Sequence, residues 1–290
     1  MTNDTFGGLI EQGDVAGLRS ALESDPGLAR RAIRWHLNQD NESDPLHYVS
    51  DCVGNGWLTN GREQEIAELL IAHGAPINGM AGRESPLIAS ASLGAERVSR
   101  VLIEAGAELE ATSIYGSRAL HWAAWMGAPT TVALLIARGA EIEPRDSRFG
   151  ATPLFWAVHG YGPNGPRTKK NQVEAARILL EAGASARTSN RDGLTALGLA
   201  RHLRAQGYAR VATTTRLDAL ANRAAGAKSQ FSEDRSRDSV ADGSRRCTVV
   251  RTTATVSQAA WLRGSTRFGG AAAAGRWSGS GGVATGSYVG

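Results

Sequence analysis

Few stretches of this sequence combine residue types and spacings that could support chemistry. Residues 160–165 read Gly-Tyr-Gly-Pro-Asn-Gly and match the G-x-G-x-x-G pattern of dinucleotide-binding loops. Such a loop needs a strand before it and a helix that starts within it. Here a helical pattern comes before Gly160, and Pro163 and Pro166 oppose a helix start. We therefore predict no cofactor site, although Lys169 and Lys170 make the segment basic.

Residues that could bind a metal or act as nucleophiles are scattered along the chain. No group of His, Cys, Asp and Glu has the spacing of a metal site. Cys52 and Cys247 lie too far apart in the sequence to indicate a disulfide framework. The chain also lacks the Gly-x-Ser-x-Gly elbow and the phosphate-binding loop with Gly-Lys-Ser/Thr. We predict no metal site and no enzymatic activity.

The most regular part of the chain is a repeat between residues 82 and 145. Leu87, Leu120 and Leu154 follow one another at spacings of 33 and 34 residues, and Gly106 and Gly139 are also 33 residues apart. A fixed period in this range indicates a protein built of stacked repeats.

Each repeat contains start and stop signals for two helices. Ser85 and Thr152 can cap free amides at a helix start, and a proline follows each of them at the first helical position. Gly94 and Gly127 then end the first helix, because glycine accepts the left-handed conformation of a helix stop. A second apolar helix follows, and a polar loop leads to the next unit. The pattern predicts a helix, a tight turn, a second helix and a projecting loop.

This pattern resembles the ankyrin repeat. The resemblance rests on Gly116, Ala119-Leu120-His121, Ala123-Ala124, Gly127, Leu134-Leu135 and Gly139-Ala140, and again on Gly150, Thr152-Pro153-Leu154, Ala157, Leu179-Leu180 and Gly183-Ala184. It implies an all-α fold, an ankyrin-repeat solenoid of about six helix-turn-helix units with projecting loops, followed by a disordered C-terminal tail. In this family the histidine at the position of His47 and His121 hydrogen-bonds to neighbouring backbone, so we expect both to be structural.

We divide the chain into an ankyrin-repeat domain at 5–221 and a low-complexity tail at 222–290. The domain has a degenerate first unit at 5–40, units at about 41–80, 81–112, 113–146 and 147–189, and a C-terminal cap at 190–221. We expect the cap to include a helix around Val211, Leu217 and Leu220. End units are atypical in such stacks because one of their faces meets water.

Two units are longer than the regular period. The distance from Leu46 to Leu87 is 41 residues, and the excess is an insertion at 52–61 between the two helices of that unit. Trp57 in this insertion could either fill a gap in the body or bind a partner. A second insertion of about ten residues occupies 160–170. We expect Asp44 to cap the first helix of the unit that contains Leu46.

The tail differs from the body in composition and charge. Residues 222–290 hold ten basic and four acidic residues, a net charge of +6, which leaves −2 for the rest of a chain whose total is +4. Ser/Arg-rich and Gly/Ala/Ser-rich sequence cannot bury enough apolar surface to offset its conformational entropy. We predict a disordered tail, and we interpret it as a segment outside the selected domain, such as an out-of-frame extension.

The resemblance also indicates which residues face a partner. We expect Trp122 and Trp156 to pack between units, and Trp125 and His159, three residues further on, to face the concave groove. The tips of the projecting loops offer Arg83, Glu84, Ile114, Tyr115, Arg145, Arg148, Phe149, Arg191 and Asp192. Aromatic side chains interleaved with arginine are typical of interface hot spots. The alternative is that the loop aromatics fold back onto the body.

The sequence therefore predicts a non-enzymatic module that binds another protein through its concave groove and loop tips. We expect it to be monomeric and cytoplasmic, since it shows no secretory signal and no apolar run of the roughly 20 residues that span a membrane. One alternative is association with nucleic acid through the Arg-rich tail, by salt-dependent phosphate contacts. Another is a secreted effector, a role that some bacterial ankyrin-repeat proteins have.

Overall fold

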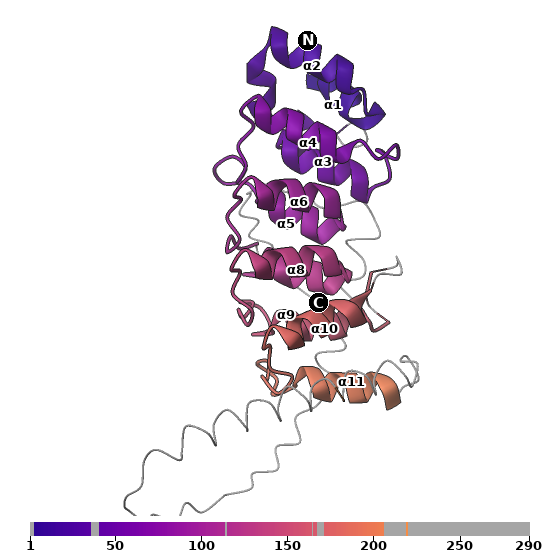
Figure 1. The fold of residues 1–290 in the computed structure, drawn as a ribbon, viewed down its shortest axis with the longest axis vertical. Coiled ribbons are helices and arrows are strands. Elements are labelled where there is room, and N and C mark those ends of the chain that lie inside the picture. The colour runs from indigo at the N-terminus through magenta and orange to yellow at the C-terminus, as the bar shows by residue number, and fades with distance from the viewer. Residues whose placement is uncertain are drawn as a thin grey trace, which may run out of the picture.

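The computed structural model describes residues 3–35, 41–113, 115–163, 165–166, 171–205 and 219. These residues form helices stacked in layers from the N-terminus to the last labelled helix (Figure 1). The elements are α1 (Asn3–Gln12), α2 (Val15–Ser24), the 3-10 helix η1 (Pro26–Arg30), β1 (Ile33–Arg34), β2 (Glu42–Ser43), α3 (Pro45–Gly54), α4 (Glu63–Ala72), α5 (Pro86–Leu93), α6 (Glu96–Glu104), α7 (Ala119–Met126), α8 (Pro129–Ala137), α9 (Pro153–Gly160), α10 (Gln172–Glu181) and α11 (Ala196–Ala205).

The helices pack as two parallel rows. The first helices of successive units, α3, α5, α7 and α9, contact one another in order, and α11 continues this row. The second helices, α4, α6, α8 and α10, do the same. The loops between units lie along one edge of the stack (Figure 1). Each unit thus shields the apolar faces of its neighbours, as in a solenoid, and the predicted all-α repeat fold is confirmed.

The structure confirms the predicted capping residues and glycine stops at the helix ends. The Ser85 hydroxyl accepts the Leu87 N–H at 3.3 Å, and Thr152 Oγ1 accepts the Phe155 N–H at 3.4 Å. Gly94 and Gly127 end α5 and α7 in the left-handed conformation, with φ of 69° and 65°.

Asp44 is an exception to the predicted capping. It precedes α3, but its side chain makes no cap hydrogen bond to that helix. Instead Oδ2 accepts the N–H of Met80 at 2.6 Å, and Oδ1 lies 3.4 Å from Nε of Arg83. The prediction that its carboxylate caps α3 is wrong, because the next loop offers it an N–H donor and a guanidinium.

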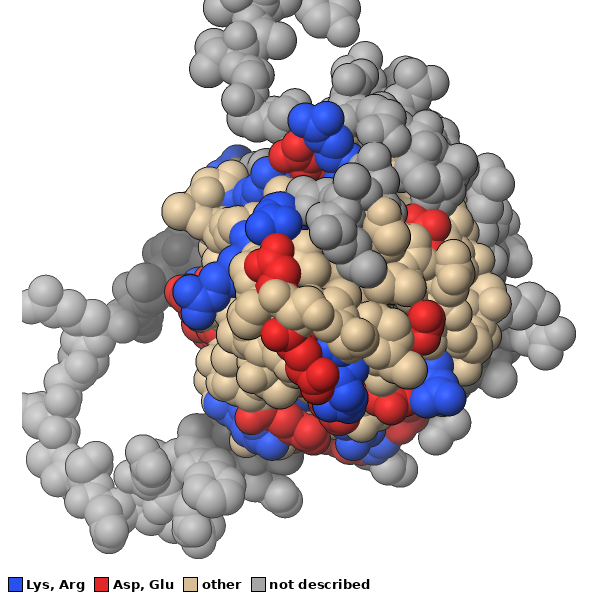
Figure 2. Space-filling view, turned by 90° about the horizontal axis from the view of Figure 1, so that it is seen from above, with Lys and Arg blue, Asp and Glu red and all other residues tan. Residues whose placement is uncertain are grey.

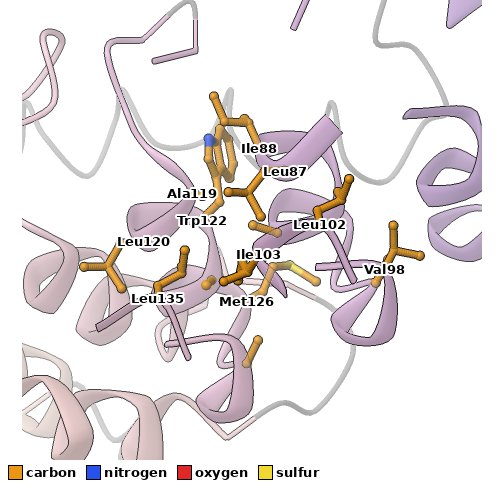
Figure 3. Close-up of a cluster of buried hydrophobic side chains, with 14 of the residues drawn as sticks. Leu87, Ile88, Val98, Leu102, Ile103, Ala119, Leu120, Trp122, Met126 and Leu135 are labelled. Atoms are coloured by element: carbon orange, nitrogen blue, oxygen red, sulfur yellow. The ribbon is translucent and has the colours of Figure 1, made fainter. Parts of the chain in front are cut away.

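The apolar core runs through the whole stack. Leu87, Leu120 and Leu154 are 0%, 2% and 2% exposed, so the three repeat leucines occupy equivalent buried positions. Figure 3 shows part of this core, in which side chains from α5, α6, α7 and α8 meet around Leu87 and Trp122. The 33-residue period therefore reports a real repetition of buried sites.

Aromatic rings of the N-terminal unit, α3 and the first insertion meet at one end of this core. The Trp57 ring meets the Trp35 ring edge-on, with centroids 5.4 Å apart, and lies 6.3 Å from the Tyr48 ring. Trp57 is half-buried against the core, so it fills a gap in the body. Two short strands, β1 and β2, pair antiparallel here, with Ile33 opposite Ser43. They are the only strands among the described residues outside isolated bridges.

Several predictions concern residues outside this description. The cap helix expected around Val211, Leu217 and Leu220, the tail at 222–290 and most of the basic end of the second insertion are among them. Among the described residues, no helix is long and apolar enough to cross a membrane.

Candidate protein-interaction surface

Hydrogen bonds join each projecting loop to the next. Asn78 Oδ1 accepts the N–H of Glu108 at 2.8 Å, Glu110 Oε1 accepts that of Glu141 at 2.9 Å, and Glu143 Oε1 accepts that of Ser185 at 2.7 Å. The acceptors Asn78, Glu110 and Glu143 recur at spacings of 32 and 33 residues. Sequence reasoning missed this ladder, although its period was the available signal. The loop edge is therefore pre-ordered.

The loop tips before α7, α9 and α11 form an arginine–aromatic arrangement. The guanidinium carbon of Arg148 lies 5.2 Å from the Tyr115 ring centroid and 5.3 Å from that of Phe149, distances typical of cation–π contacts. Arg191 donates its backbone N–H to Phe149 O at 2.8 Å and its Nη1–H to Arg148 O at 3.1 Å. We call Tyr115, Arg145, Arg148, Phe149 and Arg191 the loop-tip row.

The Asp146 carboxylate stabilises the conformation of the loop before α9 through hydrogen bonds. It is buried, with 2% of its surface exposed. Its Oδ1 accepts the N–H groups of Arg148 at 2.9 Å and Phe149 at 2.6 Å, and its Oδ2 accepts those of Ala151 at 3.0 Å and the Trp156 indole at 3.1 Å. Sequence reasoning named its neighbours and missed Asp146, because a loop aspartate also occurs in ordinary exposed turns.

The loops of the row are also tied to one another through backbone carbonyls. Ser147 donates its backbone N–H to Tyr115 O at 2.9 Å and its hydroxyl to the same oxygen at 2.7 Å. Arg145 Nη1 donates to Gly150 O at 3.1 Å and to Ser189 O at 2.7 Å. Tyr115 and Phe149 are half-buried against the core, whereas the three arginines are exposed. The aromatic rings thus rest on the body and keep one face toward the arginines.

The other predicted loop-tip residues lie in different settings. Arg83 is paired with Glu42 at 3.0 Å and approaches the buried Asp44. Glu84 is half-buried, and burial raises the pKa of its carboxyl while nearby His47 opposes that rise. Asp192 is exposed beside Arg191. Ile114 lies outside the described residues. Glu84 is therefore not the solvated loop-tip charge that its position suggested.

The prediction that Trp125 faces an open groove is wrong. Trp125 is 4% exposed, and its ring meets that of Trp122 edge-on at 5.9 Å. Trp122 in turn contacts Trp156 at 5.0 Å, which confirms that these two rings pack between units. The backbone of Trp125 is enclosed as well, since a Cβ on Gly160 would lie 2.2 Å from its carbonyl oxygen. The last residue of α9 thus packs against the end of α7.

His159, near the end of α9, is half-buried. Burial lowers its pKa to about 4, so the ring is neutral at neutral pH. The repeated histidine at position 121 has the predicted structural role. Its Nδ1 accepts the N–H of Arg118 at 3.1 Å, and Nε2 lies 3.2 Å from the carbonyl oxygen of Ala151. In His47, Nε2 lies 3.6 Å from the Asp51 carboxylate.

The described residues contain no group of three His, Cys, Asp or Glu side chains that could hold a metal ion. Cys52 is a free, buried thiol whose pKa is raised by burial, so it is a poor nucleophile. The G-x-G-x-x-G segment starts at the last residue of helix α9, which is not the strand that a dinucleotide-binding loop follows.

Comparisons with known proteins agree with this geometry. A family model described as ankyrin repeats (3 copies) matches residues 57–146 and 120–211, which together span more than half of the chain. Among solved structures, the chain is similar to an ankyrin repeat domain from Acinetobacter baumannii, with 25% sequence identity and a TM-score of 0.57. That match covers 76% of this chain and 97% of the other.

Proposed function

Because this chain belongs to the ankyrin-repeat family, we propose that it binds a partner protein through the loop-tip row. Members of the family are generally protein-interaction modules and are typically non-enzymatic. The burial of Trp125 removes the groove tryptophan that the sequence suggested, so the proposal relies on the loops before α7, α9 and α11.

The observation that carries the proposal is the stacking of Arg148 between Tyr115 and Phe149 on adjacent loops. Tyrosine and arginine are the residue types most often found at the energetic centre of interfaces. The buried Asp146 and the loop-to-loop hydrogen bonds hold these side chains before any partner arrives. A pre-ordered surface loses little conformational freedom on binding, which favours affinity.

The test is affinity capture with the full chain as bait in extracts of its native host. A Tyr115→Ala/Phe149→Ala double variant should lose the captured protein, because the ring faces that contact it are gone. A Leu9→Ala/Ile71→Ala variant is the matched control, since both positions are also partly buried apolar residues packed on the core. It should retain capture. Circular dichroism must show that both variants are folded. Equal capture by both variants would show that the loop-tip row is not the binding site.

The cytoplasm is the compartment that we propose for this interaction. Cys52 is a free thiol in the described body, and reduced cysteines are usual in cytosolic proteins. Fractionation of the native host with an antibody to this chain tests the proposal. Recovery in the culture medium would favour the secreted-effector alternative instead.

A further inference from the structure

Charge is divided unequally along the repeat stack. Residues 1–113 contain eight Arg and no Lys against 17 Asp and Glu, whereas residues 114–205 contain ten Arg and two Lys against six Asp and Glu. The first half of the stack is therefore strongly acidic and the second half basic. The whole loop-tip row lies in the basic half.

Several arginines elsewhere in the stack face carboxylates of the same chain. Arg31 pairs with Asp25 at 3.2 Å, and Arg118 pairs with both Glu110 and Glu141. On the N-terminal end of the stack, acidic and basic side chains lie next to one another (Figure 2). Most of the arginine charge there is thus already matched within the protein.

Arg145 and Arg191 differ from these arginines. Within the described part of the chain neither forms an ion pair, and the guanidinium hydrogen bonds of both go to neutral carbonyl oxygens, of Gly150, Ser189 and Arg148. Both side chains lie against Gly150, since a Cβ there would be 3.0 Å from Arg191 Cγ. The carboxylate of the same loop, Asp146, is turned inward and occupied by four N–H donors. The pair therefore presents two guanidinium charges outward, with the exposed Asp192 next to Arg191 in the chain.

We propose that the loop-tip row binds an acidic segment of a partner protein, with carboxylates at Arg145 and Arg191 and an apolar side chain against Tyr115 and Phe149. This inference rests on the proposed function and specifies its partner. Guanidinium groups match carboxylates with paired, charge-assisted hydrogen bonds. The backbone bonds that hold Arg145 and Arg191 at the tips use only part of their five N–H donors.

A nucleic acid would offer phosphates and stacking bases to the same side chains. The acidic first half of the stack disfavours it, because residues 1–113, with 17 acidic residues against eight arginines, repel a polyanion that extends beyond the basic half. A short acidic peptide can contact the basic half alone. We therefore favour the peptide and treat nucleic acid as an outcome of the test.

The test uses fluorescence anisotropy of the full chain with three labelled probes. These are a peptide of alternating Glu and Leu, the same peptide with Gln in place of Glu, and oligo(dT) of similar length. The Glu peptide should bind at least about tenfold more tightly than the Gln peptide at low salt, and the difference should shrink as salt screens the charges. Equal affinity for the two peptides would overturn the inference.

Charge variants locate the site. Arg145→Gln/Arg191→Gln should weaken binding of the Glu peptide at least about fivefold, whereas Arg19→Gln/Arg100→Gln, which removes the same charge from exposed sites in the acidic half, should leave it unchanged. Arg145→Lys/Arg191→Lys keeps the charge but loses the paired donors, so it should weaken binding less than the Gln pair does, which separates lost charge from lost folding. Equal effects of the two Gln pairs, or a larger loss of oligo(dT) than of Glu-peptide binding, would overturn the inference.

The two proposals fail in different ways. If the loop-tip row binds a partner that is not acidic, Tyr115→Ala/Phe149→Ala abolishes capture from the host extract while Arg145→Gln/Arg191→Gln does not. If the row binds no partner, neither variant changes capture.

Discussion

The buried histidine of α7 should make the stability of this protein depend on pH in a way that can be calculated. His121 is fully buried, and its Nδ1 accepts the N–H of Arg118. The proton of the neutral ring is then on Nε2 and is directed at the carbonyl oxygen of Ala151. A second proton would have to sit on Nδ1, against the Arg118 N–H. Burial lowers the pKa of His121 to about 4, even though the Asp146 carboxylate acts to raise it.

The direction and size of the effect follow from this pKa. In the unfolded chain a histidine has a pKa of about 6.5, so acid protonates the unfolded state first. Stability is therefore fully present above about pH 6.5 and is lost as the pH falls toward 4. The full difference, about 2.5 pKa units at about 1.36 kcal/mol each, is about 3 kcal/mol, of which about 2 kcal/mol should be lost by about pH 5.

The measurement is urea unfolding of wild type and His121→Asn between about pH 8 and about pH 5. The variant should be less stable at about pH 8, because the bond to Ala151 is lost. Its stability should also fall by about 2 kcal/mol less than that of wild type on acidification. His159, whose pKa is lowered in the same direction, is present in both proteins and cancels from the comparison. Parallel pH profiles for the two proteins would refute the buried, neutral state of His121.

Two further predictions concern the core, and both are measured by urea unfolding. Leu135 is completely buried in α8, so Leu135→Ala should cost about 2–5 kcal/mol, whereas Leu134→Ala, at a half-buried neighbour, should cost clearly less. Equal costs would place Leu135 outside the core. Trp125→Ala should destabilise the protein by about 3–5 kcal/mol, because the indole is packed against Trp122. If the variant is as stable as the wild type, the Trp125 indole is exposed on the groove and not packed in the core.

Most of the fold could be predicted from the sequence because its signals are local. A helix starts where Ser85 or Thr152 meets free N–H groups two or three residues away. It ends where Gly94 or Gly127 accepts a positive φ. These contacts span only a few residues, so any copy of the motif produces them. The leucine period then indicates that the copies bury equivalent faces against one another.

Exposure could not be predicted in the same way. The motif position of Trp125 indicated a place on the concave groove, yet its indole is buried against Trp122, and the end of α9 lies against its backbone. Asp44 likewise binds Met80 in the next loop, 36 residues away, although its sequence context marked a helix cap. In both cases contacts with a neighbouring unit, which the local motif does not encode, help to fix the position of the residue.

The sequence by itself determined the repeat, the helix ends and the list of arginines and aromatics on the loops. Only the tertiary structure decided that Tyr115, Arg148 and Arg191, which lie on three different loops, form one surface. The reason is that helix ends depend on hydrogen bonds between near neighbours in the chain. The meeting of loops depends instead on how the units stack and on bonds between units, such as the one from the Ser147 hydroxyl to the Tyr115 carbonyl oxygen, 32 residues away.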